Sequence, residues 1–143
     1  MALPDPVAGM VIRYSYLWSD ERRKGREEGA KDRPCVVVLA VTREDDKIIV
    51  TVAPITHRPP QPDSGAIEIP IDQKRRLRLD DEQSWIVTDE LNRFNWPGPD
   101  LKTVDARKPG RFSYGLISRD LYYKVRDAIV SQGRTRKLKI DDR

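Results

Sequence analysis

Apolar and polar residues alternate in the segment that follows Gly9. Met10, Ile12, Tyr14 and Tyr16 fall on one face of an extended chain, and the residues between them fall on the other. Such a period of two residues indicates a β-strand, because successive side chains of a strand point to opposite faces. We therefore expect the folded domain to open with a strand.

Two apolar runs follow, and they predict a pair of buried strands. Residues 35–41 are apolar on both faces and rich in β-branched side chains, which favours a central strand covered on both sides. A polar turn at residues 44–47 separates this run from a second one at residues 48–55. Because the connection is short, we expect the two strands to pair as a hairpin.

Weaker strand patterns occur later in the chain. Ile67, Ile69 and Ile71 alternate with polar residues or proline, which predicts a half-exposed strand near a sheet edge. Residues 85–88 predict another short strand.

Three segments predict loops instead. Residues 18–32 are charged and punctuated by glycine, residues 58–64 contain three prolines, and residues 95–110 are rich in both proline and glycine. We expect a mobile loop, a short loop and an irregular excursion, respectively.

A helix is predicted near the end of the chain. Ser118 can cap its N-terminus, Leu121, Val125 and Ile129 recur at helical spacing, and Gly133 can end it. The whole pattern predicts a mainly β protein with a C-terminal helix. We expect a small, strongly curved antiparallel sheet or partial barrel of about five to seven strands, capped by that helix.

A chain of 143 residues is expected to form a single domain. Prolines near the start predict a flexible lead-in over residues 1–8. The domain itself then spans residues 9–133. A basic polar tail over residues 134–143 is expected to fray.

Composition narrows the chemistry. Lys and Arg total 27 against 23 Asp and Glu, so a nucleic acid or an acidic protein segment is a reasonable partner, without a choice between them. The single cysteine, Cys35, excludes an intramolecular disulfide and a multi-cysteine zinc site, and its apolar surroundings predict an inert thiol. No run approaches the roughly 18 apolar residues of a membrane span, and the first residues lack the pattern of a secretion signal. We expect a cytoplasmic protein with no membrane partner.

Three motifs resemble those of the MazF/PemK/Kid family of toxins. They are Gly-Met-Val at residues 9–11, Glu28 placed five residues before Arg33-Pro34, and Pro-Ile-Thr at residues 54–56. The chain departs from the family at Met10, in its longer and more charged loop before Arg33, and in the excursion at residues 95–110. The resemblance implies an SH3-like barrel of the CcdB/Kid/MazF type that dimerises. It also implies an enzyme that cuts single-stranded RNA such as mRNA without a metal or other cofactor, and an acidic antitoxin that neutralises it.

RNA is cleaved when its 2′-hydroxyl attacks the neighbouring phosphate and the 5′-oxygen leaves. A metal-free protein must place the phosphate, neutralise the developing charge and move protons. Arg33 suits the second task, because a guanidinium donates two hydrogen bonds to phosphate oxygens and stays charged; otherwise it is a surface residue that balances Asp32. Thr56 can hydrogen-bond the same phosphate if the hairpin brings it near Arg33, or it merely ends a strand.

Two further residues are candidates for proton transfer. His57 is the only histidine, and its side chain suits proton transfer near neutral pH. It shares a site with Thr56 only if the strand has ended, since strand neighbours point to opposite faces, and a lone histidine is often incidental. Glu28 matches the glutamate of the family's loop and can act as a base or contact RNA, or it is an ordinary solvated side chain.

Basic clusters and one aromatic residue are candidates for RNA binding. Lysines and arginines can follow a phosphate backbone, and an aromatic ring can stack on a base. The first cluster is Arg22, Arg23, Lys24 and Arg26, the second is Lys74, Arg75 and Arg76, and the aromatic residue is Trp18. Such clusters are also common as solvated faces.

The leading interpretation is an endoribonuclease toxin of a type II toxin–antitoxin pair. The alternative is a non-catalytic toxin-like domain that binds RNA or a protein partner, and the long first loop and the excursion keep this alternative open. A gyrase poison like CcdB fits less well, because its effect depends on an apolar C-terminus and residues 139–143 are polar.

Overall fold

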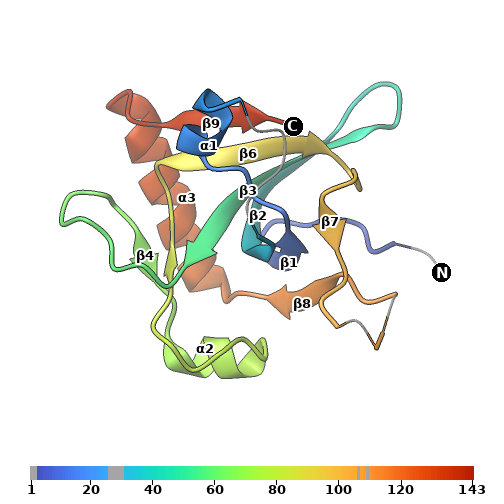
Figure 1. Cartoon of the computed structure of the whole chain (residues 1–143), viewed down its shortest axis with the longest axis horizontal. Helices are drawn as coiled ribbons and strands as arrows, with labels where there is room; N and C mark the ends of the chain where they lie inside the picture. Colours follow the sequence, from blue (N-terminus) through green and yellow to red (C-terminus); the bar gives the residue numbers. More distant parts are fainter. Residues whose placement is uncertain (1–2, 26–30, 106, 109) are drawn as a thin grey trace.

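The computed structural model describes residues 3–25, 31–105, 107–108 and 110–143 (Figure 1). Within these residues the chain forms nine strands and three helices. In order they are β1 (Met10–Tyr14), α1 (Ser19–Arg23), β2 (Arg33–Thr42), β3 (Ile48–Thr56), β4 (Ile67–Glu68), α2 (Ile71–Arg76), β5 (Trp85–Ile86), β6 (Glu90–Asn95), β7 (Leu101–Lys102), β8 (Ser113–Leu116), α3 (Arg119–Arg134) and β9 (Lys139–Asp142). The prediction of a mainly β fold with a C-terminal helix is confirmed.

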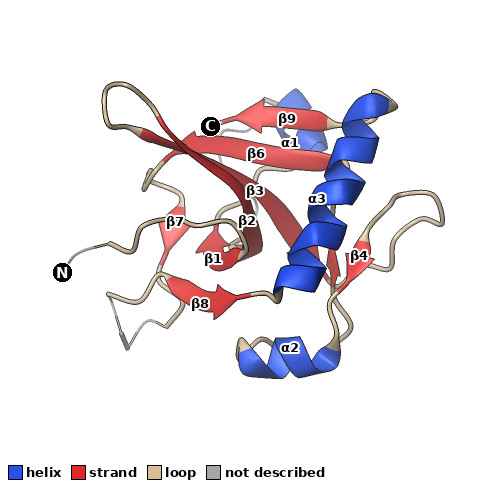
Figure 2. Cartoon of the chain, turned by 180° about the vertical axis from the view of Figure 1, so that it is seen from behind, coloured by secondary structure: helices blue, strands red, loops and turns tan. Residues whose placement is uncertain are grey.

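The centre of the sheet is the long hairpin of β2 and β3, as the two apolar runs predicted. The strands pair antiparallel, with Cys35 opposite Pro54 and Thr42 opposite Ile48. The register shifts between Val37 and Leu39, and such a bulge increases the bend and twist of a strand. β1 pairs with the other edge of β2, and β6 with the other edge of β3. Figure 2 shows the resulting curved sheet with α3 lying across one side of it.

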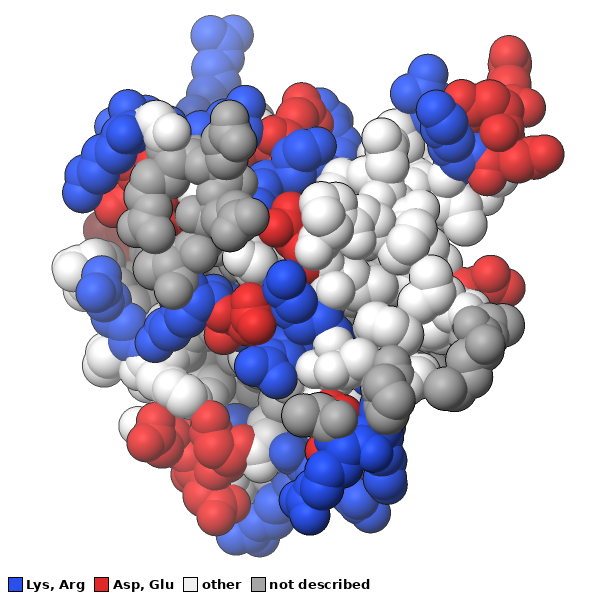
Figure 3. Space-filling view, turned by 45° about the vertical axis from the view of Figure 1, so that its right-hand side comes forward, with Lys and Arg blue, Asp and Glu red and all other residues white. Residues whose placement is uncertain are grey.

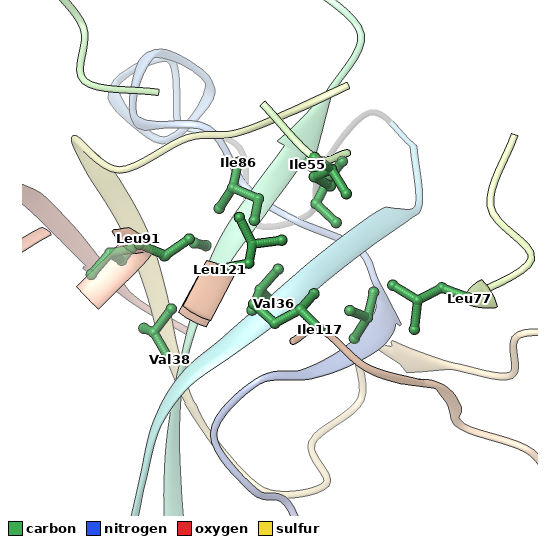
Figure 4. Close-up of a cluster of buried hydrophobic side chains, with 12 residues drawn as sticks. Val36, Val38, Ile55, Leu77, Ile86, Leu91, Ile117 and Leu121 are labelled. Carbon is green, nitrogen blue, oxygen red and sulfur yellow. The ribbon is translucent and has the colours of Figure 1, made fainter. Parts of the chain in front are cut away.

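Alternate residues of β1 serve two hydrophobic clusters. Val11 packs in the cluster beneath α3, whereas Ile12 and Tyr14 pack in a second cluster on the other side of the sheet. Each of these side chains is fully buried, and burial of one such side chain stabilises a fold by roughly 1.5–3 kcal/mol. Figure 4 shows the first cluster, drawn from β2, β3, β5, β6 and α3 and the segments beside them; it labels Val36, Val38, Ile55, Leu77, Ile86, Leu91, Ile117 and Leu121.

The C-terminal helix begins as predicted. The hydroxyl oxygen of Ser118 accepts a hydrogen bond from the backbone N–H of Leu121 at 3.1 Å, which is a helix N-cap. The hydroxyl of Tyr122 donates to the carbonyl oxygen of Val38 at 2.9 Å and ties the helix to β2. α3 has 16 residues, and no helix in the described part of the chain is long and apolar enough to cross a membrane.

Two short helices form where the sequence predicted other structure. α1 lies in the predicted loop at residues 18–32, and its start is fixed because the Glu21 carboxylate accepts a hydrogen bond from the N–H of Trp18 at 3.1 Å. Ile71 begins α2 instead of ending a strand, because β4 stops at Glu68. The predicted edge strand is therefore only two residues long.

Two strands that the pattern did not predict are β6 and β8. A third strand, β7, interrupts the excursion at residues 95–110, which is otherwise irregular, and pairs with β1.

The frayed tail predicted for residues 134–143 is wrong, because β9 pairs in parallel with β6. The last side chain, Arg143, is only 3% exposed and lies against Asp100 at 3.1 Å. The packed unit therefore extends past Gly133.

Candidate functional site: a pocket at the start of β2

A pocket of about 860 Å³ opens where β2 begins and β3 ends. Four of the residues that the sequence singled out line it together: Trp18, Arg33, Thr56 and His57. The two basic clusters contribute only Arg23 and Lys74 to its wall. The hairpin thus assembles the described candidates for chemistry, while the described basic candidates Arg22, Lys24, Arg75 and Arg76 lie elsewhere.

The register of the hairpin explains why Arg33 and Thr56 meet. Cys35 lies opposite Pro54, so two more residues along the same register place Arg33 opposite Thr56. Opposed residues of an antiparallel pair project from the same face of the sheet. Both side chains are partly exposed, so both reach the pocket.

The guanidinium of Arg33 rests on an aromatic ring. Its central carbon lies 4.8 Å from the centroid of the Trp18 ring, a cation–π geometry that fixes the plane of the charged group. The Nε–H of Arg33 is buried and has no acceptor among the described residues. Because a buried donor without an acceptor is costly, an anion that accepts from this guanidinium would be favoured in the pocket.

Two side chains of β6 fix the position of the segment around Trp18. The side-chain amide of Asn92 accepts from the N–H of Leu17 and donates to its carbonyl oxygen, each at 2.9 Å. One carboxylate oxygen of Glu90 accepts from the hydroxyl of Tyr16 and from the N–H of Ser19, each at 3.1 Å. Three hydrogen bonds therefore fix the backbone on both sides of Trp18, and a fourth holds the side chain of Tyr16.

The hydroxyl of Thr56 is available to a ligand. Its oxygen accepts a hydrogen bond from the N–H of Arg58 at 3.1 Å. A hydroxyl that accepts through its oxygen keeps its own proton free to donate. Thr56 can therefore donate to a phosphate oxygen held by Arg33.

His57 lines the same pocket but lies between two carboxylates. Its Nε2 lies 2.6 Å from Asp80 and its Nδ1 lies 3.2 Å from Glu82. A neutral imidazole can donate to only one of them, whereas the imidazolium donates to both. Both ring nitrogens of His57 therefore lie within hydrogen-bond distance of a carboxylate.

Lys74 was predicted to lie in an exposed basic cluster, but its side chain is buried. Its side chain is only 1% exposed. The ammonium donates to the carboxylate of Asp80 at 2.5 Å, to the hydroxyl of Ser84 at 2.6 Å and to the backbone carbonyl oxygen of Glu82. All three protons are used inside the protein, so we interpret Lys74 as a residue that shapes the wall of the pocket.

Asp80 joins Lys74 to His57. Partial burial alone would raise the pKa of Asp80, but the hydrogen bond from Lys74 and the nearby charges of His57 and Lys74 hold this pKa below its usual value. The carboxylate is therefore charged at neutral pH. His57, Asp80 and Glu82 also form a group of possible metal ligands whose donor atoms lie within 4.8 Å of one another. Lys74 occupies one oxygen of Asp80 in this group.

The remaining basic candidates lie outside the pocket wall. Arg22 donates to the carbonyl oxygen of Asp142 in β9 at 2.6 Å, and Lys24 is exposed. Arg75 and Arg76 are exposed on α2, and Arg76 donates to the carbonyl oxygen of Leu116. Two other candidates, Arg26 and Glu28, lie outside the described residues.

Glu90 is a pocket residue that sequence reasoning missed. Burial raises its pKa, and the charges of Asp89 and Asp141 raise it further, against hydrogen bonds from Ser19 and Tyr16. A carboxyl group with a raised pKa in a pocket is a feature of functional sites. In the sequence Glu90 follows Asp89 as one acid among many, and nothing local indicates its burial.

The raised pKa leads to a prediction about stability. The folded protein holds the proton of Glu90 more tightly than the unfolded chain, so ionisation of Glu90 destabilises the fold as the pH rises above about 4.5. Glutamine keeps the acceptor oxygen and has no charge. We expect Glu90→Gln to unfold at a higher temperature than the wild type at pH 7, and the difference to shrink towards pH 4. Thermal unfolding followed by circular dichroism checks this, with Glu44→Gln at the exposed hairpin turn as the control; a lower midpoint at pH 7 would show that the carboxylate's hydrogen bonds dominate.

Comparison with known proteins places the chain in a family. The model of the PemK-like, MazF-like toxins of type II toxin–antitoxin systems matches residues 15–97, which is more than half of the chain. The match includes α1, the β2–β3 hairpin and the pocket residues from Trp18 to Glu90. A comparison with curated proteins gives no match. The chain belongs to the PemK-like, MazF-like toxin family, whose members are the toxins of toxin–antitoxin pairs.

Proposed function

We propose that this toxin is an endoribonuclease that cuts single-stranded RNA, such as mRNA, by attack of a 2′-hydroxyl on the adjacent phosphate, without a metal ion. The observation that carries the proposal is the pairing of Arg33 and Thr56 in one pocket, with the Arg33 guanidinium stacked on Trp18. A charged donor that is already oriented stabilises the developing phosphate charge without reorganisation.

The candidate residues have separate roles in this proposal. Arg33 neutralises charge on the phosphate, and Thr56 donates a hydrogen bond to a phosphate oxygen. His57 supplies the proton to the leaving 5′-oxygen after one of its two ring nitrogens separates from its carboxylate partner. Trp18 stacks on a base beside the cleaved bond. Glu28 is the family's candidate for the base that deprotonates the 2′-hydroxyl.

The partners follow from the same proposal. The pocket wall carries as many acidic as basic residues, so the resemblance to the family, and not the charge of the pocket, supports an acidic antitoxin segment as the partner. The resemblance to MazF and Kid further suggests that the toxin acts as a homodimer in the cytoplasm.

Cleavage of total RNA by the purified protein in the presence of EDTA tests the proposal. We expect fragments with 2′,3′-cyclic phosphate and 5′-hydroxyl ends, because the attacking oxygen belongs to the RNA. Arg33→Ala protein purified in parallel controls for contaminating nucleases. Intact RNA would favour the non-catalytic RNA-binding alternative, and activity that disappears with EDTA would contradict metal independence.

A further inference from the structure

A second basic surface lies on the far side of β1 from the pocket. We propose that Arg13, Lys102, Lys108 and Arg111 form a binding surface for the phosphates of the RNA segment that flanks the cleaved bond. This inference rests on the proposed nuclease function but concerns a different part of the molecule. All four of its residues lie outside the segment matched by the family model.

The surface begins with two cations placed side by side. Arg13 of β1 lies directly opposite Lys102 of β7, so their side chains project from the same face. Like charges in this position destabilise a sheet unless an anion lies between them. Asp32 offsets part of this charge through Arg13, at 3.5 Å.

The segment after β7 adds further cations. A backbone hydrogen bond from Val104 to Arg111, at 2.9 Å, folds the segment back on itself and places Arg111 beside Val104, two residues after Lys102. Lys108 lies in the turn between them, where its N–H donates to the carbonyl oxygen of Asp105. Arg107 is 94% exposed and pairs only loosely, at 3.8 Å, with Asp105. No ion pair joins Lys102, Lys108 or Arg111 to a carboxylate within the described part of the chain. Figure 3 shows blue side chains gathered in the lower part of this view of the surface, next to a group of red ones.

The surface is continuous with the pocket. Asp32 lines the pocket and at the same time contacts Arg13, and the strands lie in the order β2, β1, β7. Arg33 pairs with Tyr14 and therefore projects from the other face of the sheet than Arg13 and Lys102. An RNA chain that leaves the pocket therefore passes Asp32 and the end of β1 to reach Lys102.

Single-stranded RNA is the partner that fits best. Proteins bind it through a basic track combined with partly exposed aromatic rings. Tyr114 provides such a ring, since it is half-buried against the cluster beneath α3 and lies near Arg13. Phe112 is also half-buried, but it packs against the second cluster. An acidic protein segment would need the charge but not the rings.

The test compares RNA of two lengths. The surface variant carries Lys102→Gln, Lys108→Gln and Arg111→Gln, and the control carries Arg43→Gln, Lys47→Gln and Lys124→Gln, which remove the same charge from exposed positions on the β2–β3 turn and α3. Each variant is titrated with two RNAs that a 2′-deoxy sugar at the cut site makes non-cleavable. One RNA has about five nucleotides and the other about twenty, a range that spans the site sizes of single-strand binders. Fluorescence anisotropy at several salt concentrations gives the dissociation constants.

We expect the surface variant to bind the long RNA about tenfold more weakly, with a salt slope smaller by about 2, which corresponds to three lost phosphate contacts at about 0.7 each. The short RNA should bind equally to both variants. Equal weakening by the control variant, or unchanged binding of the long RNA, would overturn the proposal. A variant that loses affinity only for poly-glutamate would assign the surface to an acidic protein segment instead.

The measurement separates this inference from the proposed nuclease activity. Because the probes are non-cleavable, the surface can be supported even if the protein does not cut RNA. If the triple variant does not fold, the double variant Lys102→Gln with Lys108→Gln gives the same comparison, with two phosphate contacts removed instead of three.

Discussion

Replacing Arg33 with alanine is expected to lower the rate of RNA cleavage about 100- to 1,000-fold, because a preorganised donor to the developing charge is worth roughly 3–4 kcal/mol. Arg33 is the pocket arginine whose guanidinium lies over the ring of Trp18, which fixes its plane. Arg33→Lys should retain part of the activity, since an ammonium keeps the charge but lacks the planar pair of donors.

The fold should survive this change. Arg33 is the first residue of β2, its side chain is partly exposed, and its Nε–H has no acceptor among the described residues. Single-turnover cleavage of a defined RNA, measured together with the thermal midpoint, separates chemistry from unfolding. Arg43→Ala, on the exposed turn of the same hairpin, is the matched control. Near wild-type cleavage by a folded Arg33→Ala protein would remove Arg33 from the proposed mechanism.

The β2–β3 hairpin and the Arg33–Thr56 pair could be predicted because both depend on local patterns. Two β-branched runs with a short polar turn define the hairpin, and its register then decides which residues meet at its open end. The same reasoning identified Ser118 as the start of α3, since a cap followed by helical spacing is also a local signal.

β6 was missed because a buried polar residue interrupts its pattern. Asn92 is fully buried, yet it is satisfied by hydrogen bonds to the backbone of Leu17, 75 residues away in sequence. Sequence periodicity counts such a residue as exposed. β9 was missed for a related reason, since a short polar strand forms only because the edge of β6 is there to pair with it.

α1 and α2 are five and six residues long, which is too short for helical periodicity to become visible. Because neither helix was predicted, the residues that α1 and α2 contribute to the pocket wall could not be predicted either. Glu90 is a functional candidate because it is buried in the pocket beside the start of α1, and this burial raises its pKa.

Lys74→Ala is expected to destabilise the protein by about 2–4 kcal/mol. Breaking a buried ion pair from one side costs roughly 3–5 kcal/mol, and we lower this value because Asp80 is 48% exposed and water can partly replace the lost ammonium. The substitution also leaves the hydroxyl of Ser84, which is 1% exposed, without the donor that now satisfies it. Its neighbour Arg75 is exposed on the same helix, so Arg75→Ala should change stability by less than about 0.5 kcal/mol.

Lys74→Met distinguishes packing from hydrogen bonding at this position. Methionine fills most of the volume of the buried chain but donates nothing, so its cost should be lower than that of alanine yet well above that of Arg75→Ala. Urea unfolding at pH 7 gives the three free energies. The loss should be accompanied by weaker RNA cleavage, because Lys74 holds the Asp80 carboxylate that positions His57. Stability equal to that of the wild type in Lys74→Met would mean that the ammonium is replaced without loss and that the pocket wall does not depend on it.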